Sequence, residues 1–169
     1  NFNFISLRPT QPSLTEVFTN RLIDEVQDPA LQEALHAARE GKAHVNNPVF
    51  KDSRTIAHKV AMMGEVGVLE ALIQVRANLN MKDKDGLTPA HVAAMHGHAY
   101  IITTLHRAKA GLNIRSKYGL TPAHVAAMHG HAHIIKALHR ARAKLNIKSD
   151  EGFAPVHVAA GYGHVHVIN

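Results

Sequence analysis

The stretch Thr88-Pro89-Ala90-His91-Val92-Ala93-Ala94 decides the fold of this chain, because it returns unchanged 33 residues later over 121–127. One histidine and one glycine mark the same period in four successive units. They are His58, His91, His124 and His157, and Gly64, Gly97, Gly130 and Gly163. A fixed period of this length indicates stacked copies of one supersecondary unit. We therefore predict an all-α repeat solenoid.

Each unit carries the same local signals. Thr88 suits an N-cap, and the proline after it suits the first position of a helix. The pattern predicts a short helix over 90–95 and a second helix over 99–108, followed by an extended loop. At the turn between them we expect no room for a β-branched side chain at Gly97 or at the equivalent Gly130.

The chain before the first unit predicts helices of a different kind. Ser13 and Glu16 have the spacing of a capping box, and Asp28 precedes a proline as an N-cap does. Gly41 is a typical stop signal. The expected elements are an irregular stretch over 1–12, a helix over 14–26 and a helix from 29 to near 40.

Composition limits the class of protein. The 169 residues suffice for one domain, and the absence of cysteine excludes a disulfide framework. Such a composition is compatible with an intracellular compartment, and we expect a cytoplasmic location. Neither a membrane-spanning apolar run nor a signal peptide is evident from Asn1 onward.

Charge is distributed unevenly along the chain. Residues 82–148 hold eleven Lys and Arg against two Asp, whereas residues 1–50 hold four Lys and Arg against six Asp and Glu. A basic middle favours a partner with an acidic surface.

The repeated residues resemble the ankyrin repeat motif G-x-T-P-L-H-x-A-A-x-x-G-H. The resemblance covers roughly 48–169, and residues 14–47 are similar to the helical N-terminal cap of that family. It implies stacked antiparallel helix pairs with projecting β-hairpin loops, and a protein partner bound on the concave face of a monomer. The expected divisions are an irregular N-terminus and cap over 1–47 and repeats over 48–81, 82–114, 115–147 and 148–169, the last incomplete.

Departures from the family motif have local consequences. Ala154 replaces the N-cap threonine, which costs about 1 kcal/mol of local stability. The glycine that ends the second helix is replaced by Arg76, Lys109 and Arg142, whose charges meet the negative end of the helix dipole. The chain ends at Asn169 inside an expected helix, so we expect either that the native molecule continues or that its end frayed and was removed.

The candidate partner-binding residues lie at the contact positions that the resemblance implies on the concave face and at the adjoining hairpin tips. They are Arg54, Met62, Met63, Lys84, Leu87, Met95, His96, Lys117, Tyr118, Leu120, Met128, His129, Phe153 and Tyr162. Methionine suits adaptable protein-binding surfaces, although the methionines could equally pack between neighbouring helices. We expect Phe153 and Tyr162 to be exposed for contact.

Two groups of basic residues allow more than one interpretation. The hairpin tips carry a basic row that either is simply solvated or steers an acidic partner. The row consists of Lys82, Lys84, Arg115, Lys117 and Lys148. A second cluster at the ends of the second helices should face away from the groove, where dipole complementation explains it. It consists of Arg107, Lys109, Arg140, Arg142 and Lys144. Without a nucleic-acid-binding motif, we do not expect a nucleic acid partner.

The fifteen histidines suggest metal binding by number, but their spacing argues against it. Gly97 and Gly130 interrupt the helices inside the clusters, so the i, i+4 pairs that zinc favours do not form. The resemblance instead implies structural roles for most of them. We expect His106 and His139 to form a half-buried stack, and buried imidazoles could make the fold sensitive to pH.

Catalysis has little support in the sequence. The chain has no G-x-S-x-G elbow, no phosphate-cradling glycine loop and no H-E-x-x-H motif. We therefore expect a non-catalytic protein-interaction module without metal or cofactor. The alternative is the targeting domain of a larger enzyme, or of a secreted bacterial effector acting in the host cytoplasm, with a catalytic region beyond residue 169.

Overall fold

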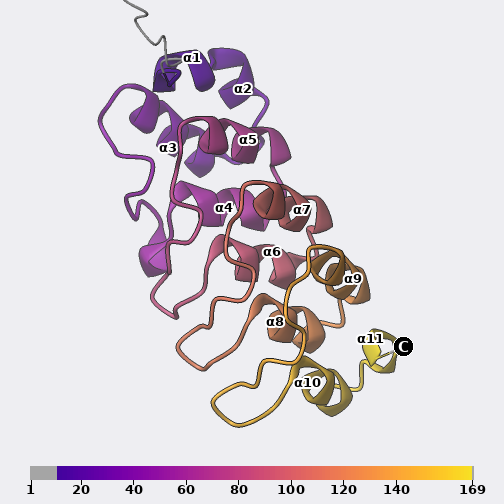
Figure 1. The fold of residues 1–169 in the computed structure, drawn as a ribbon. Helices are drawn as coiled ribbons and strands as arrows, with labels where there is room; N and C mark the ends of the chain where they lie inside the picture. The colour runs from indigo at the N-terminus through magenta and orange to yellow at the C-terminus, as the bar shows by residue number, and fades with distance from the viewer. Residues whose placement is uncertain (1–10, 169) are drawn as a thin grey trace, which may run out of the picture.

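The computed structural model describes residues 11–168, with the backbone alone for the last of these, and shows a stack of helix pairs (Figure 1). The expected irregular stretch over 1–12 lies mostly outside the described residues. The helices are α1 (Leu14–Val17), α2 (Asn20–Asp24), α3 (Pro29–Arg39), α4 (Ile56–Met63), α5 (Val66–Gln74), α6 (Pro89–His96), α7 (Ala99–Arg107), α8 (Pro122–Met128), α9 (Ala132–Arg140), α10 (Pro155–Gly161) and α11 (Val165–Ile168), with a 3-10 turn over Lys51–Ser53.

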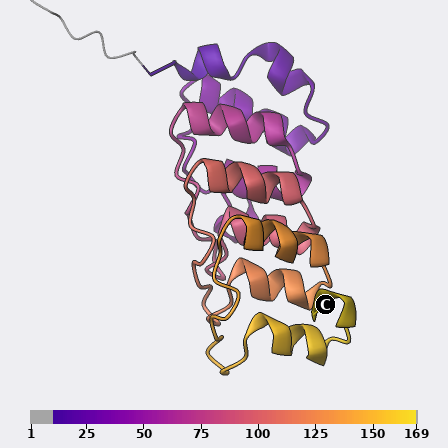
Figure 2. The ribbon, with the colours of Figure 1, turned by 45° about the vertical axis from the view of Figure 1, so that its right-hand side comes forward.

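The helices form two rows. Helices α4, α6, α8 and α10 pack side by side as the first row, and α5, α7, α9 and α11 form the second (Figure 2). The loops that link successive pairs project together to one side of the stack. This arrangement is the predicted all-α repeat solenoid.

The two rows bury their residues differently. In α6 the residues from Pro89 to Ala94 are all buried, since this helix lies between α4 and α8. Small alanines in the first row let neighbouring helices approach closely. In α7 the side chains of Ile101, Ile102 and Leu105 face the core, whereas Tyr100 on the outer side is 81% exposed. The second row therefore presents one face to solvent.

The N-terminal cap differs from the prediction at one point. A single helix over 14–26 is wrong, because the chain breaks between α1 and α2. Phe18 leaves helical geometry and is completely buried, and the Thr19 hydroxyl then caps α2 by accepting the Leu22 N–H at 3.2 Å. Burying an aromatic ring here outweighs the continuity of a short helix.

Other cap predictions are confirmed. Ser13 and Glu16 form the capping box of α1, and the Asp28 carboxylate accepts the Leu31 N–H at 2.8 Å. Gly41 follows α3 with a φ of +73°.

The projecting loops are tight turns joined to one another at the backbone. In the second unit the Asp83 N–H donates to the Leu87 carbonyl at 2.8 Å and closes the turn. The Lys117 N–H then donates to the Asp85 carbonyl of the preceding loop at 3.0 Å. Across the described residues these hairpin turns form no strand, and the isolated bridge joins Phe50 and Arg54.

The turn glycines Gly97 and Gly130 differ in the space around them. Both have positive φ, of +77° and +72°. A Cβ on Gly130 would lie 2.8 Å from Nδ1 of His164, so the prediction of no room is confirmed there. At Gly97 the nearest atoms would lie 3.4 Å from an added Cβ, which is ordinary contact, so there the lack of room for a β-branched side chain stays a prediction. The positive φ disfavours any side chain at this position.

Restoring the missing N-cap is expected to stabilise the last described unit. Ala154 has the extended backbone of an N-cap, with φ −84° and ψ 163°, and Thr88 and Thr121 occupy the equivalent sites. Ala154→Thr should raise the free energy of unfolding by about 1 kcal/mol. Chemical denaturation measures the change. Ala154→Val adds the same bulk without the hydroxyl, and an equal gain in both variants would contradict the capping explanation.

Candidate functional site

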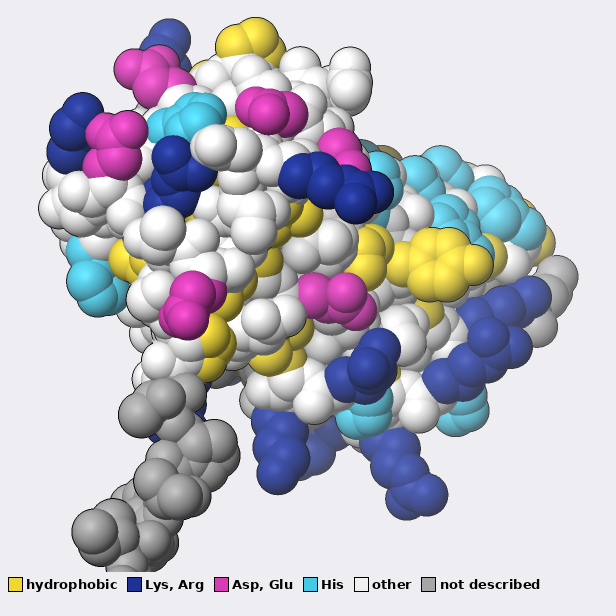
Figure 3. All heavy atoms as spheres, turned by 90° about the horizontal axis from the view of Figure 1, so that it is seen from above, with side chains coloured by type: hydrophobic (Ala, Val, Ile, Leu, Met, Phe, Trp, Pro, Cys, Tyr) yellow, Lys and Arg dark blue, Asp and Glu magenta, His cyan; other side chains and the backbone are white. Residues whose placement is uncertain are grey.

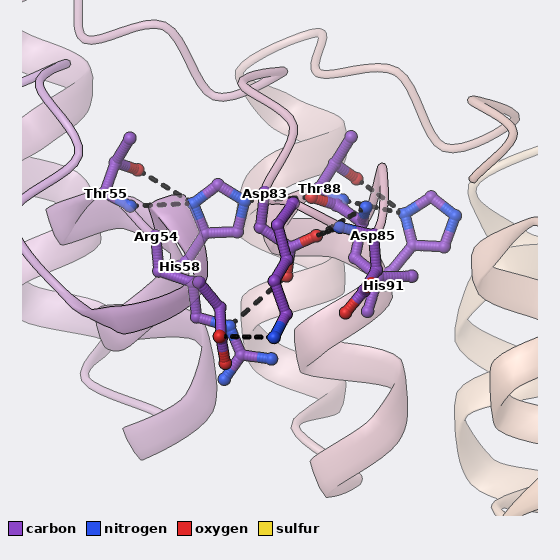
Figure 4. A network of polar contacts seen from close by, with 10 residues as sticks. Arg54, Thr55, His58, Asp83, Asp85, Thr88 and His91 are labelled. Atoms are coloured by element: carbon purple, nitrogen blue, oxygen red, sulfur yellow. Dashed lines mark hydrogen bonds and ion pairs between the residues drawn. The ribbon is translucent and has the colours of Figure 1, made fainter. Parts of the chain in front are cut away.

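Buried histidines tie each unit to the next (Figure 4). His91 accepts the Thr88 N–H at Nδ1 over 3.0 Å, so its proton must lie on Nε2. Nε2–H then donates to the Leu120 carbonyl of the following unit at 2.9 Å. The same contact joins His58 to Leu87 at 3.0 Å and His124 to Phe153 at 2.9 Å. These bonds fix the backbone of the loop residues that face the concave side.

The buried position keeps these imidazoles neutral. Burial lowers the pKa of His91 to about 4, although the bond to the Leu120 carbonyl acts in the opposite direction. Burial likewise lowers the pKa of His58 and of His124. Their role is structural, as the resemblance implies.

A second set of histidines holds the ends of the first-row helices. His98, His131 and His164 each bring Nε2 within 3.0–3.1 Å of a carbonyl in the preceding unit. Their partners are Met62, Met95 and Met128, all of them candidate partner-binding residues. The methionine backbone is therefore fixed, while the side chains remain half-buried.

Each of these histidines also supports a ring at the concave side. His96 stacks on His98, His129 on His131 and Tyr162 on His164, with ring centroids 6.3, 6.1 and 6.5 Å apart. The interplanar angles are 16° or less. Burial, followed by the charge on His98, lowers the pKa of His96. The sequence predicted the outer rings as contacts but missed their stacking partners, although the repeated spacing of two residues is a visible signal.

The structure brings five of the predicted residues together. A hollow of about 650 Å³ lies at the end of the groove formed by the last two units, and acidic side chains of Asp150 and Glu151 also line it. The predicted residues in it are Tyr118, Leu120, Met128, Phe153 and Tyr162. The rings of Tyr118, Phe153 and Tyr162 are 66%, 50% and 59% exposed. Exposed aromatic rings around a hollow are typical of contact sites.

The remaining predicted residues lie elsewhere along the groove. Arg54 and Met62 line a smaller hollow of about 210 Å³ beside the first hairpin. Met63, His96 and His129 are exposed, whereas Leu87 and Met95 are half-buried. Met62 and Met95 also pack against the core, so both interpretations of the methionines apply to the same side chains.

Two cations of the basic row at the hairpin tips form ion pairs with acidic neighbours. The Lys84 ammonium lies 2.6 Å from the Asp52 carboxylate, and the Arg115 guanidinium lies 2.7 Å from that of Asp150. Arg54 pairs at 3.3 Å with the buried Asp83, as Figure 4 shows. Lys117 is exposed and forms no ion pair among the described residues.

Two expectations about histidine have different outcomes. His106 and His139 are both exposed on the second-row helices, so a half-buried stack is wrong. Each follows an inward leucine directly in sequence, which turns the imidazole outward. Within residues 11–168, no group of three or more His, Asp or Glu is placed to hold a metal ion.

Comparison with known families agrees with this geometry. A stack of helix pairs in two rows, with loops that project to one side, defines a helical repeat protein. The family model described as ankyrin repeats in three copies matches residues 20–117 and 99–169, and the chain belongs to the ankyrin repeat family. Proteins with these repeats are generally protein–protein interaction modules and are typically non-catalytic. The search of curated proteins found no match. No helix in the described part of the chain is long and apolar enough to cross a membrane.

Proposed function

We propose that this chain is a non-catalytic recognition module that binds a protein partner through its concave groove. The observation that carries the proposal is the hollow of about 650 Å³ that gathers three exposed aromatic rings around Leu120 and Met128. Aromatic side chains supply large contact areas at a small entropic cost, and methionine adapts to the shape that it meets.

The groove is prepared for binding by its supporting contacts. Tyr162 stacks on His164, which is itself bonded to the Met128 carbonyl at 3.1 Å. His124 holds the backbone of Phe153 through a bond of 2.9 Å. A partner therefore meets rings whose surroundings are already ordered, and preorganisation of this kind favours affinity.

Positive and negative side chains lie at different places along the groove. Lys117 keeps an exposed ammonium at a hairpin tip, whereas Asp150 and Glu151 line the hollow itself. We propose that Lys117 steers an acidic segment of the partner toward the tips while apolar side chains enter the hollow.

Shortening three side chains that line the hollow to alanine is expected to weaken partner binding about 100-fold or more, because central aromatic contacts dominate interface energies. The variant is Met128→Ala, Phe153→Ala and Tyr162→Ala together. All three side chains are partly exposed, so we expect the free energy of unfolding to change by no more than about 1–2 kcal/mol. Affinity capture from a lysate, quantified by mass spectrometry, compares this variant with the unchanged chain.

The matched control removes an exposed apolar side chain that lies outside the concave hollow and the second-row helices. Val49→Ala, in the chain before α4, should capture the same protein as the unchanged chain. A protein lost by the groove variant and kept by Val49→Ala is the expected partner, and Kd is then measured with purified material. If both variants retain every captured protein, binding through the groove is wrong.

A further inference from the structure

The outward face of α7 and α9 carries charge of one sign. Between Gly86 and Ser149 the sequence holds nine Lys and Arg and no Asp or Glu. Six of the cations lie on α7 and α9 or on the turns after them: Arg107, Lys109, Lys136, Arg140, Arg142 and Lys144. All six are exposed, and none forms an ion pair within the described residues. Figure 3 shows dark blue and cyan side chains without magenta on the part of the surface away from the cap.

Several cations occupy a backbone conformation that suits glycine better. Arg76, Lys109 and Arg142 lie two residues after the ends of α5, α7 and α9, with φ of 55°, 60° and 57°. A left-handed conformation costs an ordinary residue roughly 1–2 kcal/mol, and glycine avoids this cost. Three successive units thus place a positively charged residue where glycine would be less strained. This repetition indicates that the positive charge has a function.

A groove runs along the seam between α7 and α9. It consists of two hollows, of about 540 and 460 Å³, which share His106 and Ala141. Ala137 lines the first hollow, and Leu112 and Ile114 line the second. The floor of the groove is therefore mainly apolar.

Cations and one aromatic ring form the edge of this groove. Lys136 and Arg140 line the first hollow and Arg142 lines the second. Tyr100, which is 81% exposed, lies beside the first. The surface is thus an apolar channel with a basic edge, on the helices that do not form the concave groove.

We propose that this outer groove binds an acidic peptide segment that also carries bulky apolar side chains. Carboxylates would pair with Arg140 and Arg142, whose guanidinium groups favour bidentate contacts. Leucine-sized side chains would enter the hollows at Ala137 and Ala141 and bury apolar area. A nucleic acid backbone satisfies the charges but leaves the apolar hollows empty, so the peptide fits both properties of the surface.

The proposal is tested by fluorescence anisotropy with a labelled peptide of alternating Glu and Leu. The comparison ligands are a labelled peptide of Glu alone and a labelled oligothymidylate. The charge variant carries Lys136→Gln, Arg140→Gln and Arg142→Gln. Its matched control, Lys51→Gln, Lys82→Gln and Lys148→Gln, removes three exposed cations from the hairpin tips. The Glu–Leu peptide should bind the unchanged chain, lose about tenfold or more in affinity with the charge variant, and keep its affinity with the control.

A second variant tests the contribution of the apolar hollow to peptide affinity separately from that of the cations. Ala137→Phe fills the first hollow and removes no cation, so it should weaken the Glu–Leu peptide and leave binding of the Glu peptide unchanged. Circular dichroism checks that each variant is folded. Equal affinity for the two peptides, tighter binding of the oligonucleotide, equal losses in both charge variants, or no binding at all would each overturn the proposal. Tyr162→Ala in the concave groove should leave peptide binding intact, so failure of one proposal is distinguishable from failure of the other.

Discussion

Lowering the pH from about 7 to about 4 is expected to destabilise the stack by about 3 kcal/mol through His91 alone. Burial lowers the pKa of this imidazole from 6.5 to about 4, so the unfolded chain takes up the proton first. The stability that His91 contributes is fully present above pH 6.5 and declines as the pH falls toward about 4. His58 and His124, whose pKa values are also lowered, act in the same direction.

The structure gives the reason for this sensitivity. Protonation of His91 would add a hydrogen at Nδ1, the atom that accepts the Thr88 N–H at 3.0 Å. Two donors would then face each other in a site that excludes water. Acid therefore weakens the contact that joins neighbouring units.

Chemical denaturation at several pH values tests this expectation. His91→Gln cannot titrate, so its free energy of unfolding should be lower at pH 7 but should depend less steeply on pH. The slopes of the two proteins should differ by as much as about 1.4 kcal/mol per pH unit within the titration window. Parallel curves for the two proteins would show that His91 is not the source of the acid sensitivity.

Replacing Gly119 by alanine is expected to lower the free energy of unfolding by roughly 2–5 kcal/mol. The residue has a φ of +70°, and an added Cβ would lie 2.6 Å from the backbone nitrogen of Asp150 in the next loop. A flexible side chain could move away, but this backbone cannot do so without separating the stacked hairpin turns. The cost of placing a side chain at positive φ and the cost of the close contact with the next loop therefore add together.

Gly152→Ala supplies the matched control. Gly152 has the same kind of conformation, with a φ of +86°, but no atom lies within 4 Å of its added Cβ. It should lose about 1–2 kcal/mol, from the backbone conformation alone. Thermal and chemical denaturation compare the two variants, and equal losses would show that contact between adjacent hairpin turns has no part in the effect.

Local signals predicted most element boundaries well. The expected helix over 90–95 is α6 from Pro89 to His96, and the expected helix over 99–108 is α7 from Ala99 to Arg107. Caps and turn glycines are short-range features, so their consequences can be read from the sequence. The break at Phe18 was missed because it depends on a core that residues distant in the chain provide.

The candidate site was predicted less completely. The sequence identified the aromatic and methionine positions, and the structure gathers five of them around one hollow. It did not reveal which tip cations form ion pairs: Lys84 pairs with Asp52, which lies 32 positions earlier in the chain. Pairings over this separation depend on how the units stack.

By itself the sequence determined the repeat, the helix pairs and the buried histidines, because a 33-residue period with caps and turn glycines permits few other folds. The tertiary structure alone decided which charged side chains form ion pairs and which exposed rings stack on a histidine. It also decided that two hollows join along α7 and α9 beneath a basic edge. Those properties arise where neighbouring units meet, and the distances across such contacts follow from packing.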